Sequence, residues 1–277
     1  MRREALVQQI REKQSFLCVG LDIDLEKIPA HLKDVKDPLW TFGKAIVDAT
    51  AAYAVAFKPN IAFFETYGQQ GWQSLERLME YIHTTYPEIF TIADAKRGDI
   101  GNTATRYAKA FFEQMDFDSI TVAPYMGKDS VEPFLAFEDN HTILLGLTSN
   151  EGAQDFQYLE CDGIPLHQHV LQQSQSWKGS ERLMYVVGAT RAEALEEIRK
   201  SVPDSFLLVP GVGAQGGSLS AVAQHGLNRD CGLLVNSSRG IIYADTTENF
   251  AAVAGQKAAE LQQQMKTLLQ KYAIFST

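Results

Sequence analysis

Short apolar runs alternate with longer amphipathic stretches along all 277 residues of the chain. The short runs read as buried strands, and the stretches between them repeat apolar residues every three or four positions, as helices do. Strands that alternate with helices in this way are typical of parallel βα units. We predict eight strands, at residues 16–22, 55–59, 89–96, 119–123, 142–147, 184–188, 206–210 and 232–236.

The intervening pattern predicts helices at residues 38–53, 71–85, 102–114, 166–177, 191–201 and 248–272. Eight βα units indicate an α/β protein with a closed (β/α)8 TIM barrel, and we expect residues 1–277 to form a single domain. A doubly wound open sheet is the alternative. That fold usually carries a glycine fingerprint after its first strand, which Gly20-Leu21-Asp22 is not.

Composition narrows the class of protein. An apolar fraction of 45% with 21% charged residues is ordinary for a globular protein. The net charge of -9 argues against sequence-independent nucleic-acid binding, which needs basic patches. There is no signal-peptide pattern and no apolar run long enough to span a membrane. We therefore predict a cytoplasmic protein with no membrane or nucleic-acid partner.

Cysteine and histidine positions suggest no metal site. Cys18, Cys161 and Cys231 are widely spaced and form no CxxC pair, which favours reduced thiols over a disulfide framework or zinc knuckle. The histidines are scattered, and we expect them in surface or helix-capping roles. These are His31, His83, His141, His167, His169 and His225.

The most informative charges follow the third predicted strand. Asp94 and Lys96 are two residues apart, so strand alternation points them to the same side, and Asp99 comes in the turn that follows. Burying such a pair costs desolvation that Coulomb attraction barely recovers. We therefore favour a functional site over the alternative, an ion pair that merely closes the strand end.

Other strands also end in charges. In a barrel the active site lies at the carboxyl ends of the strands, where Asp22 follows the first strand and Lys58 the second. We expect Asp22, Lys58, Asp94 and Lys96 to converge, although either of the first two alone could be a solvated loop charge. In such an array each acid keeps a cation protonated, so Lys96 would be a proton donor.

A glycine-rich segment, residues 210–217, follows the seventh strand and contains a G-x-G-x-x-G spacing. A dinucleotide site would need that spacing after the first strand, so we do not predict one. Barrels commonly bind phosphate with the loops after strands seven and eight. Arg239, at the end of the eighth strand, and Gln215 would supply donors to such a phosphate. A merely tight turn is the alternative.

Taken together, these motifs resemble the longer bacterial form of orotidine 5′-phosphate decarboxylase. The resemblance rests on D-x-K-x-x-D-I at residues 94–100, on Lys58, on residues 210–217 and on Arg239. Residues 57–60, 147–150 and 238–240 extend it over almost the whole chain. Magnesium-dependent sugar-phosphate decarboxylases and synthases of the same superfamily share the D-x-K-x-x-D core, and they stand as the alternative.

The resemblance implies a carboxy-lyase that converts orotidine 5′-phosphate to UMP, the last step of de novo pyrimidine synthesis, without a cofactor or metal. Lys96 would protonate C6 as carbon dioxide leaves, and Asp94 would sit against the C6 carboxylate. Lys58 would anchor Asp94 and a ribose hydroxyl. Asp99 and Thr103 would reach the site of the partner subunit, which implies a homodimer with shared active sites.

The same resemblance assigns the remaining substrate contacts. Asp22 would bind the ribose, Ser149 would read the pyrimidine ring, and Gln215 with Arg239 would hold the 5′-phosphate. Thr148 and Asn150 are equally polar neighbours of Ser149, so the pyrimidine contact lies within residues 148–150.

Two other classes remain open from the residues. A Schiff-base aldolase would use Lys96 or Lys58 as its amine, but flanking carboxylates raise the pKa that such a lysine needs lowered. A non-catalytic barrel could bind a phosphorylated nucleotide, although the complete charged array argues against it. Ser149 and Ser238 have no suitably placed histidine, so serine nucleophile chemistry has little support.

Overall fold

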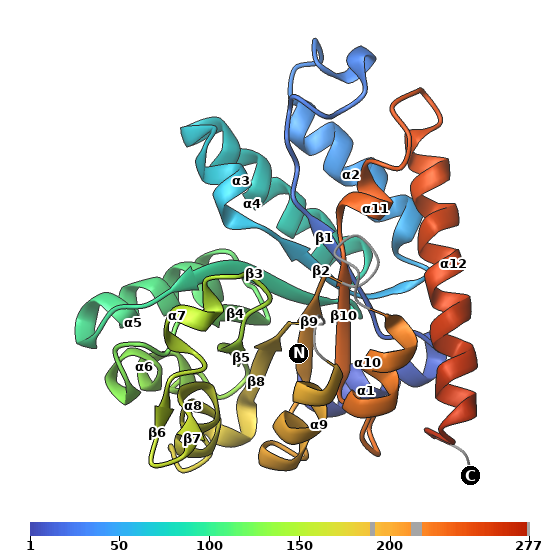
Figure 1. Ribbon diagram of the computed structural model, residues 1–277. Helices are drawn as coiled ribbons and strands as arrows, with labels where there is room; N and C mark the ends of the chain where they lie inside the picture. The colour runs from blue at the N-terminus through green and yellow to red at the C-terminus, as the bar shows by residue number, and fades with distance from the viewer. Residues whose placement is uncertain (189–191, 212–217, 276–277) are drawn as a thin grey trace.

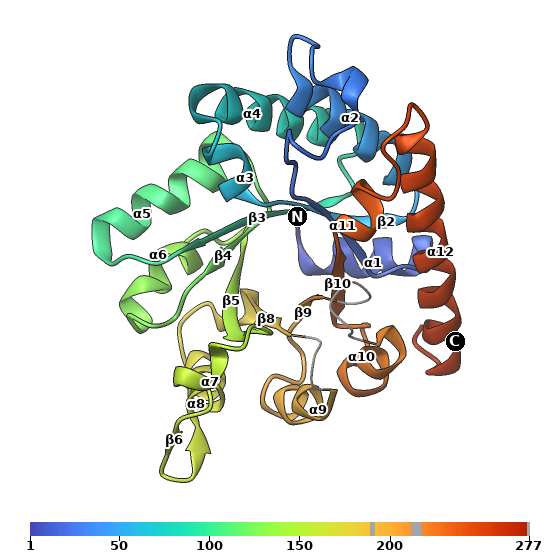
Figure 2. The same ribbon diagram turned by 45° about the horizontal axis from the view of Figure 1, so that its top comes forward.

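The computed structural model describes residues 1–188, 192–211 and 218–275. Within them, eight parallel strands close into a barrel in the order β1-β10-β9-β8-β5-β4-β3-β2 (Figures 1 and 2). The barrel strands are β1 (Leu17–Leu21), β2 (Ala54–Pro59), β3 (Phe90–Arg97), β4 (Ser119–Val122), β5 (His141–Leu147), β8 (Leu183–Val187), β9 (Leu207–Pro210) and β10 (Leu233–Ser237).

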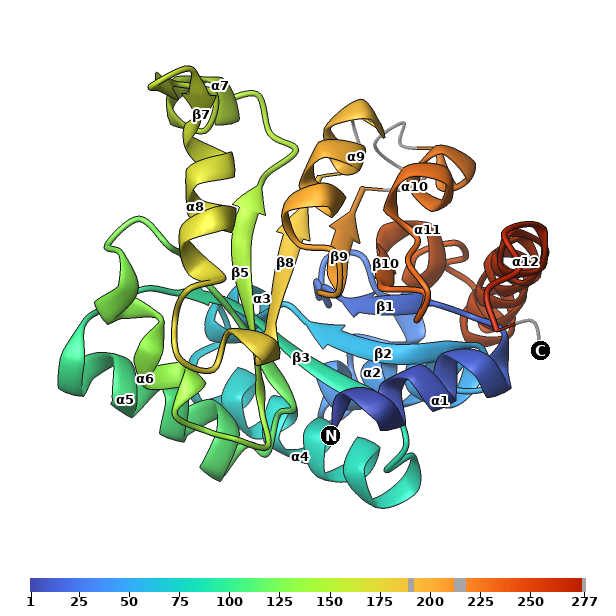
Figure 3. The same ribbon diagram turned by 90° about the horizontal axis from the view of Figure 1, so that it is seen from below.

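Helices surround the barrel, and α1 packs beside β2 on the side seen in Figure 3. The helices are α1 (Arg3–Lys13), α2 (Pro38–Thr50), α3 (Ile61–Glu65), α4 (Gly68–Thr85), α5 (Gly101–Lys109), α6 (Glu132–Leu135), α7 (Ala153–Phe156), α8 (Leu166–Ser174), α9 (Ala192–Ser201), α10 (Leu219–Gly226), α11 (Arg239–Ile242) and α12 (Phe250–Lys271). A π-helical turn (Ala110–Gln114) extends α5, and short 3₁₀ turns lie at Ala30–Leu32, Lys128–Ser130 and Ser180–Arg182.

The predicted barrel is confirmed, and each predicted strand begins and ends within one residue of an observed barrel strand. The agreement is this close because barrel strands are buried on both faces: every residue of β1, β2 and β4 is buried. The sequence did not predict a small antiparallel hairpin between β5 and α8, formed by β6 (Glu160–Cys161) and β7 (Ile164–Pro165).

The helix α2 illustrates how the outer layer is held. Its first turn is capped by Asp37, whose carboxylate accepts a hydrogen bond from the Trp40 N–H at 3.1 Å. Its apolar face, which includes Phe42, is buried. The same face packs against α12, where Phe42 stacks on Phe250 and a Cβ at Gly255 would lie 2.8 Å from the Ala49 carbonyl oxygen. Only glycine allows this approach of the two helices.

Two histidines correct the sequence analysis. His141 and His167 are buried, rather than exposed or capping. His141 is the first residue of β5 and packs edge-on against Phe90, with ring centroids 5.6 Å apart. His167 lies in the first turn of α8, and its Nδ1 is 2.9 Å from the Gln157 carbonyl oxygen. Burial lowers the pKa of His167 and lowers that of His141 to about 4.

The cysteines agree with the prediction of reduced thiols, since Cys18, Cys161 and Cys231 are all unpaired. Cys18 and Cys231 are buried, and burial raises the pKa of each thiol to about 12. Across the described ranges, no helix combines the length and apolar character that crossing a membrane would require.

Candidate active site

Polar side chains from several strands meet in one cavity of about 180 Å³. Its lining comes from the carboxyl ends of β1, β2, β3, β9 and β10 and from the residues that follow them, which is where a barrel carries its chemistry. The lining residues are Asp22, Lys58, Asn60, Asp94, Pro210, Gly211, Asn236, Ser237, Ser238 and Arg239. The predicted convergence of Asp22, Lys58 and Asp94 is therefore observed.

Asp94 lies between two lysines. Lys58 Nζ is 2.7 Å from Asp94 Oδ2, and Lys96 Nζ contacts Asp94 Oδ1. The side chains of Lys58 and Asp94 are only 5% and 10% exposed, whereas that of Lys96 is 52% exposed. Lys58 and Asp94 thus form a buried ion pair, and Lys96 reaches the same carboxylate from the open side.

The charges hold one another ionised. Burial alone would lower the pKa of Lys58, but the carboxylates of Asp94 and Asp22 outweigh it, so this pKa lies above its ordinary value. Burial alone would raise the pKa of Asp94, but Lys58 and Lys96 outweigh it and hold this pKa well below its ordinary value. At neutral pH the site therefore contains a buried carboxylate beside a buried ammonium group.

The backbone that carries Lys96 is not a regular strand. In the pairing of β3 with β4, Ala93 lies opposite Ile120 and Arg97 opposite Val122, so three residues of β3 face Thr121 alone. Lys96 has φ +47°, a left-handed conformation that is uncommon outside glycine. Asp94 and Lys96 do meet, as predicted, but through this bulge rather than through simple strand alternation.

Sequence analysis missed Thr121, which is fully buried within β4. Its hydroxyl lies 3.2 Å from Asp94 Oδ1 and accepts a hydrogen bond from the Lys96 backbone N–H at 2.9 Å. A threonine inside a strand carries no distinctive sequence signal, because β-branched residues are common there. Only the bulge brings its hydroxyl to both partners.

Two buried oxygen atoms in the cavity have no hydrogen-bond partner among the residues described. They are Asp22 Oδ1 and Ser238 Oγ. Buried polar atoms are normally satisfied, so such atoms in a cavity suit a polar ligand. Gly20 lets β1 lie close to Ser238, which follows β10, since a Cβ at Gly20 would lie 2.8 Å from Ser238 Cβ. The Asp22 carbonyl also accepts a hydrogen bond from the Tyr243 hydroxyl at 2.8 Å, which fixes the end of β1.

The predicted phosphate-binding region is partly described. Pro210 and Gly211 line the cavity together with Arg239, the exposed first residue of α11. Gly211 has φ +87°, a conformation that glycine adopts readily. Gln215 lies outside the described residues. The described part brings a glycine and a guanidinium group to the lining of one cavity, and such groups suit an anion site.

Besides Lys96, which reaches Asp94 from the open side, three other predicted residues among those described do not line this cavity. Ser149 follows β5 and packs closely against Gly188, which follows β8, since a Cβ at Gly188 would lie 2.8 Å from Ser149 Cα. Asp99 is partly exposed and accepts a hydrogen bond from the Ile100 N–H at 2.8 Å, within its own loop. Thr103 is exposed in the first turn of α5.

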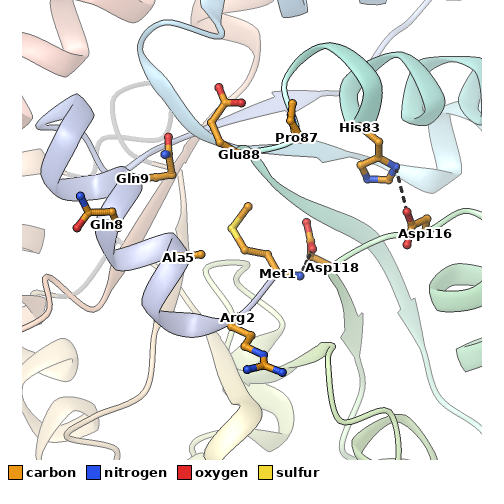
Figure 4. Close-up of a pocket in the computed structure, with 10 residues that line it drawn as sticks. All are labelled: Met1, Arg2, Ala5, Gln8, Gln9, His83, Pro87, Glu88, Asp116 and Asp118. Carbon is orange, nitrogen blue, oxygen red and sulfur yellow. Dashed lines mark hydrogen bonds and ion pairs between the residues drawn. The ribbon is translucent and has the colours of Figure 1, made fainter.

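A larger cavity, of about 650 Å³, is found elsewhere on the molecule (Figure 4). Its lining includes Glu88 and Asp118, which precede β3 and β4, so it lies at the amino ends of the strands. Figure 4 shows the Met1 amine directed at the Asp118 carboxylate, with which it forms an ion pair. Barrel enzymes carry their active sites at the opposite end, so the smaller cavity is the candidate site.

The acidic groups of the site do not form a recognisable metal set. Among the described residues, nowhere do three or more histidine, cysteine, aspartate or glutamate side chains come together as potential metal ligands.

Comparison with known proteins identifies the family to which the chain belongs. A family model described as the orotidine 5′-phosphate decarboxylase / HUMPS family matches residues 15–253. The chain belongs to this family. Orotidine 5′-phosphate decarboxylase from Christiangramia forsetii is 61% identical over 271 residues, which cover 98% of this chain and all of the relative. The enzyme of that name from Flavobacterium johnsoniae is 62% identical over 269 residues, covering 97% and 98%.

Solved structures of the orotidine 5′-phosphate decarboxylase family have the same fold. The OMP decarboxylase of Leishmania donovani superimposes with a TM-score of 0.82 at 34% identity, over 97% of this chain and 98% of that one. The UMP synthase of the same organism gives a TM-score of 0.84 at 36% identity, over 97% of this chain and 56% of that one. Membership of a decarboxylase family accords with the Asp94 to Ile100 motif.

Proposed function

We propose that this chain converts orotidine 5′-phosphate to uridine 5′-phosphate and carbon dioxide. The observation that carries the proposal is the Asp94 carboxylate, buried and held ionised between Lys58 and Lys96 beside the cavity. The reaction must expel an anionic carboxylate and protonate the carbanion that remains. The Asp94 carboxylate can repel the first, and the adjacent Lys96 ammonium group can protonate the second. The names and the high identity of the curated relatives support the same reaction.

The reaction breaks the bond between C6 and its carboxylate. Carbon dioxide leaves without the electron pair, which stays on C6, and Lys96 donates a proton to that carbon. Lys96 then regains a proton from solvent, so atoms and charge balance. Asp94 disfavours the substrate carboxylate by like-charge repulsion, and this repulsion is relieved as carbon dioxide departs. Lys58 holds Asp94 in place through their 2.7 Å contact.

Binding of the nucleotide uses the rest of the cavity. Asp22 takes the ribose hydroxyls, Arg239 and Gln215 take the 5′-phosphate, and Ser149 reads the pyrimidine ring. The unpartnered Asp22 Oδ1 and the position of Arg239 on the cavity wall support the first two assignments. Phosphate binding at a distance from C6 supplies energy that holds the carboxylate against Asp94.

We further propose a cytoplasmic homodimer in which Asp99 and Thr103 complete the site of the partner subunit. Both lie on the loop and helix that follow β3, and Asp99 bonds within its loop rather than to Lys58, Asp94 or Lys96 in the described structure. Ile100, which follows Asp99, and Tyr125, which follows β4, are large apolar residues that are 54% and 86% exposed. A second copy of the chain would cover such a surface.

The deciding assay follows the absorbance of orotidine 5′-phosphate after addition of purified protein treated with a chelator, with chromatographic detection of uridine 5′-phosphate. We expect the substrate to be consumed at the same rate with and without the chelator. No consumption by folded protein would contradict the proposed reaction. Activity that requires added magnesium would instead favour the sugar-phosphate decarboxylases and synthases that share the D-x-K-x-x-D core.

A further inference from the structure

Thr121 makes two hydrogen bonds whose directions are fixed by chemistry. The Lys96 backbone N–H can only donate, so at 2.9 Å the Thr121 oxygen accepts from it. The Asp94 carboxylate is ionised and can only accept, so at 3.2 Å the Thr121 hydroxyl hydrogen points to Asp94 Oδ1. One buried hydroxyl therefore joins the backbone of Lys96 to the side chain of Asp94.

The two hydrogen bonds of Thr121 are made to the bulged part of β3. Three residues of β3 stand opposite Thr121, and Lys96 adopts φ +47°. A left-handed non-glycine residue is strained and persists only where its surroundings hold it. The Thr121 hydroxyl supplies such a restraint, because it binds the amide of the strained residue itself.

We propose that Thr121 is a positioning residue for the decarboxylation: its hydroxyl fixes the Lys96 backbone and the Asp94 carboxylate in one geometry. This inference rests on the proposed function and extends it to a residue outside the cavity lining. The Lys96 side chain is 52% exposed, and its ammonium group contacts Asp94, which the Thr121 hydroxyl also holds. Loss of this hydroxyl removes a restraint at both ends of the Lys96 side chain and so misplaces the ammonium group. Displacements of about 1 Å in a catalytic group can cost on the order of 100-fold in rate.

The test compares two substitutions at Thr121. Thr121→Val keeps the shape and removes both hydrogen bonds, whereas Thr121→Ser keeps the hydroxyl and removes a methyl group. We expect Thr121→Val to lower kcat on the order of 10- to 100-fold while KM and the Kd for uridine 5′-phosphate change by less than about threefold. Thr121→Ser should retain kcat within about threefold.

Thr142 provides the matched control. It is a buried threonine on β5, beside β4, and its hydroxyl has no hydrogen-bond partner among the described residues. Thr142→Val should leave kcat unchanged. Equal losses in the valine and serine variants of Thr121, or full activity in Thr121→Val, would overturn the proposal.

A second measurement separates this proposal from the proposed reaction. Amide hydrogen exchange at Lys96, followed by NMR, reports the anchor without any turnover. We expect exchange at Lys96 to accelerate at least about tenfold in Thr121→Val and to stay unchanged in Thr142→Val. Unchanged exchange in Thr121→Val would overturn the positioning role even if the protein proved inactive on orotidine 5′-phosphate. An inactive parent protein with accelerated exchange would overturn the reaction and keep the anchor.

Discussion

Lys58 and Asp94 form an ion pair 2.7 Å long in which both side chains are almost completely removed from solvent. Breaking such a pair leaves one charge buried without its partner. We expect Lys58→Met to lower the free energy of unfolding by about 3 kcal/mol, near the lower end of the range for buried pairs, because Lys96 still contacts Asp94. Urea denaturation monitored by circular dichroism measures this change.

The double variant Lys58→Met/Asp94→Asn tests whether the cost comes from the unpaired charge. Its loss of stability should be smaller than the sum of the losses in the two single variants, because neither member of the pair is left as a buried charge without its partner. Lys257→Met is the control: its 2.8 Å pair with Glu260 is exposed, and its removal should change the free energy of unfolding by at most about 1 kcal/mol. Additive effects at Lys58 and Asp94 would contradict the coupling.

Lys96→Ala should abolish turnover while leaving the nucleotide site intact. Lys96 contacts Asp94 but is not part of the cavity lining, so we expect the Kd for uridine 5′-phosphate to change only a few-fold. Loss of the proton donor should lower kcat by about 100- to 10,000-fold or more. Absorbance assays and isothermal titration with uridine 5′-phosphate measure the two quantities.

Lys96→Arg distinguishes proton donation from charge. Arginine keeps the positive charge beside Asp94 but does not release its proton in proteins. It should therefore be as inactive as Lys96→Ala. Substantial activity in Lys96→Arg would mean that Lys96 acts through its charge alone.

Much of the barrel was predictable because the burial of each strand is visible in the pattern of its own residues. Strands buried on both faces appear as continuous apolar runs, and the polar residue that ends each run marks the catalytic edge, as Asp22 and Lys58 do. The β6–β7 hairpin was missed because two-residue strands have no measurable periodicity. His141 was misjudged because the sequence does not reveal that its ring packs in the interior against Phe90.

The site was predictable as a set of charges but not as a geometry. Asp94 and Lys96 meet as the sequence predicts, but they do so through the bulge and the left-handed Lys96, which depend on pairing with β4, and not through regular alternation along β3. The role of Thr121 depends on the same pairing, because only a residue opposite the bulge can hydrogen-bond both the Lys96 backbone and the Asp94 carboxylate. The sequence shows which charged and polar side chains are available, whereas the pairing of strands determines which of these side chains contact one another.

Shared active sites predict recovery of activity from two inactive variants. Lys96→Ala and Asp99→Ala subunits, co-expressed with different affinity tags, should form mixed dimers with one site that contains both intact residues. Random pairing gives about half mixed dimers, so about a quarter of the parent activity should return. The turnover of the mixture, compared with that of each variant alone, measures this.

The control for mixing uses two variants of the same residue. Lys96→Ala combined with Lys96→Arg gives no site with an intact Lys96, so no activity should return in any pairing. If Lys96→Ala and Asp99→Ala also give no recovery although the mixed dimer is isolated by its tags, Asp99 does not serve the partner's site.

Stability below neutral pH should depend on His141. Burial lowers the pKa of this histidine from 6.5 to about 4 in the folded protein. Between these values the unfolded chain binds a proton at His141 that the folded protein does not, so acidification favours unfolding. The resulting loss is about 3 kcal/mol between pH 7 and pH 4, and it is complete below the folded pKa.

His141→Phe isolates this contribution, because phenylalanine keeps an aromatic ring against Phe90 and cannot take up a proton. Measured by urea denaturation at intervals from pH 7 to pH 4, the variant should gain about 3 kcal/mol relative to the parent protein as the pH falls, whatever its stability at pH 7. The exposed His31 supplies the control, and His31→Gln should follow the parent curve. Parallel curves for the parent and His141→Phe would mean that His141 takes up its proton in the folded protein as readily as in the unfolded chain.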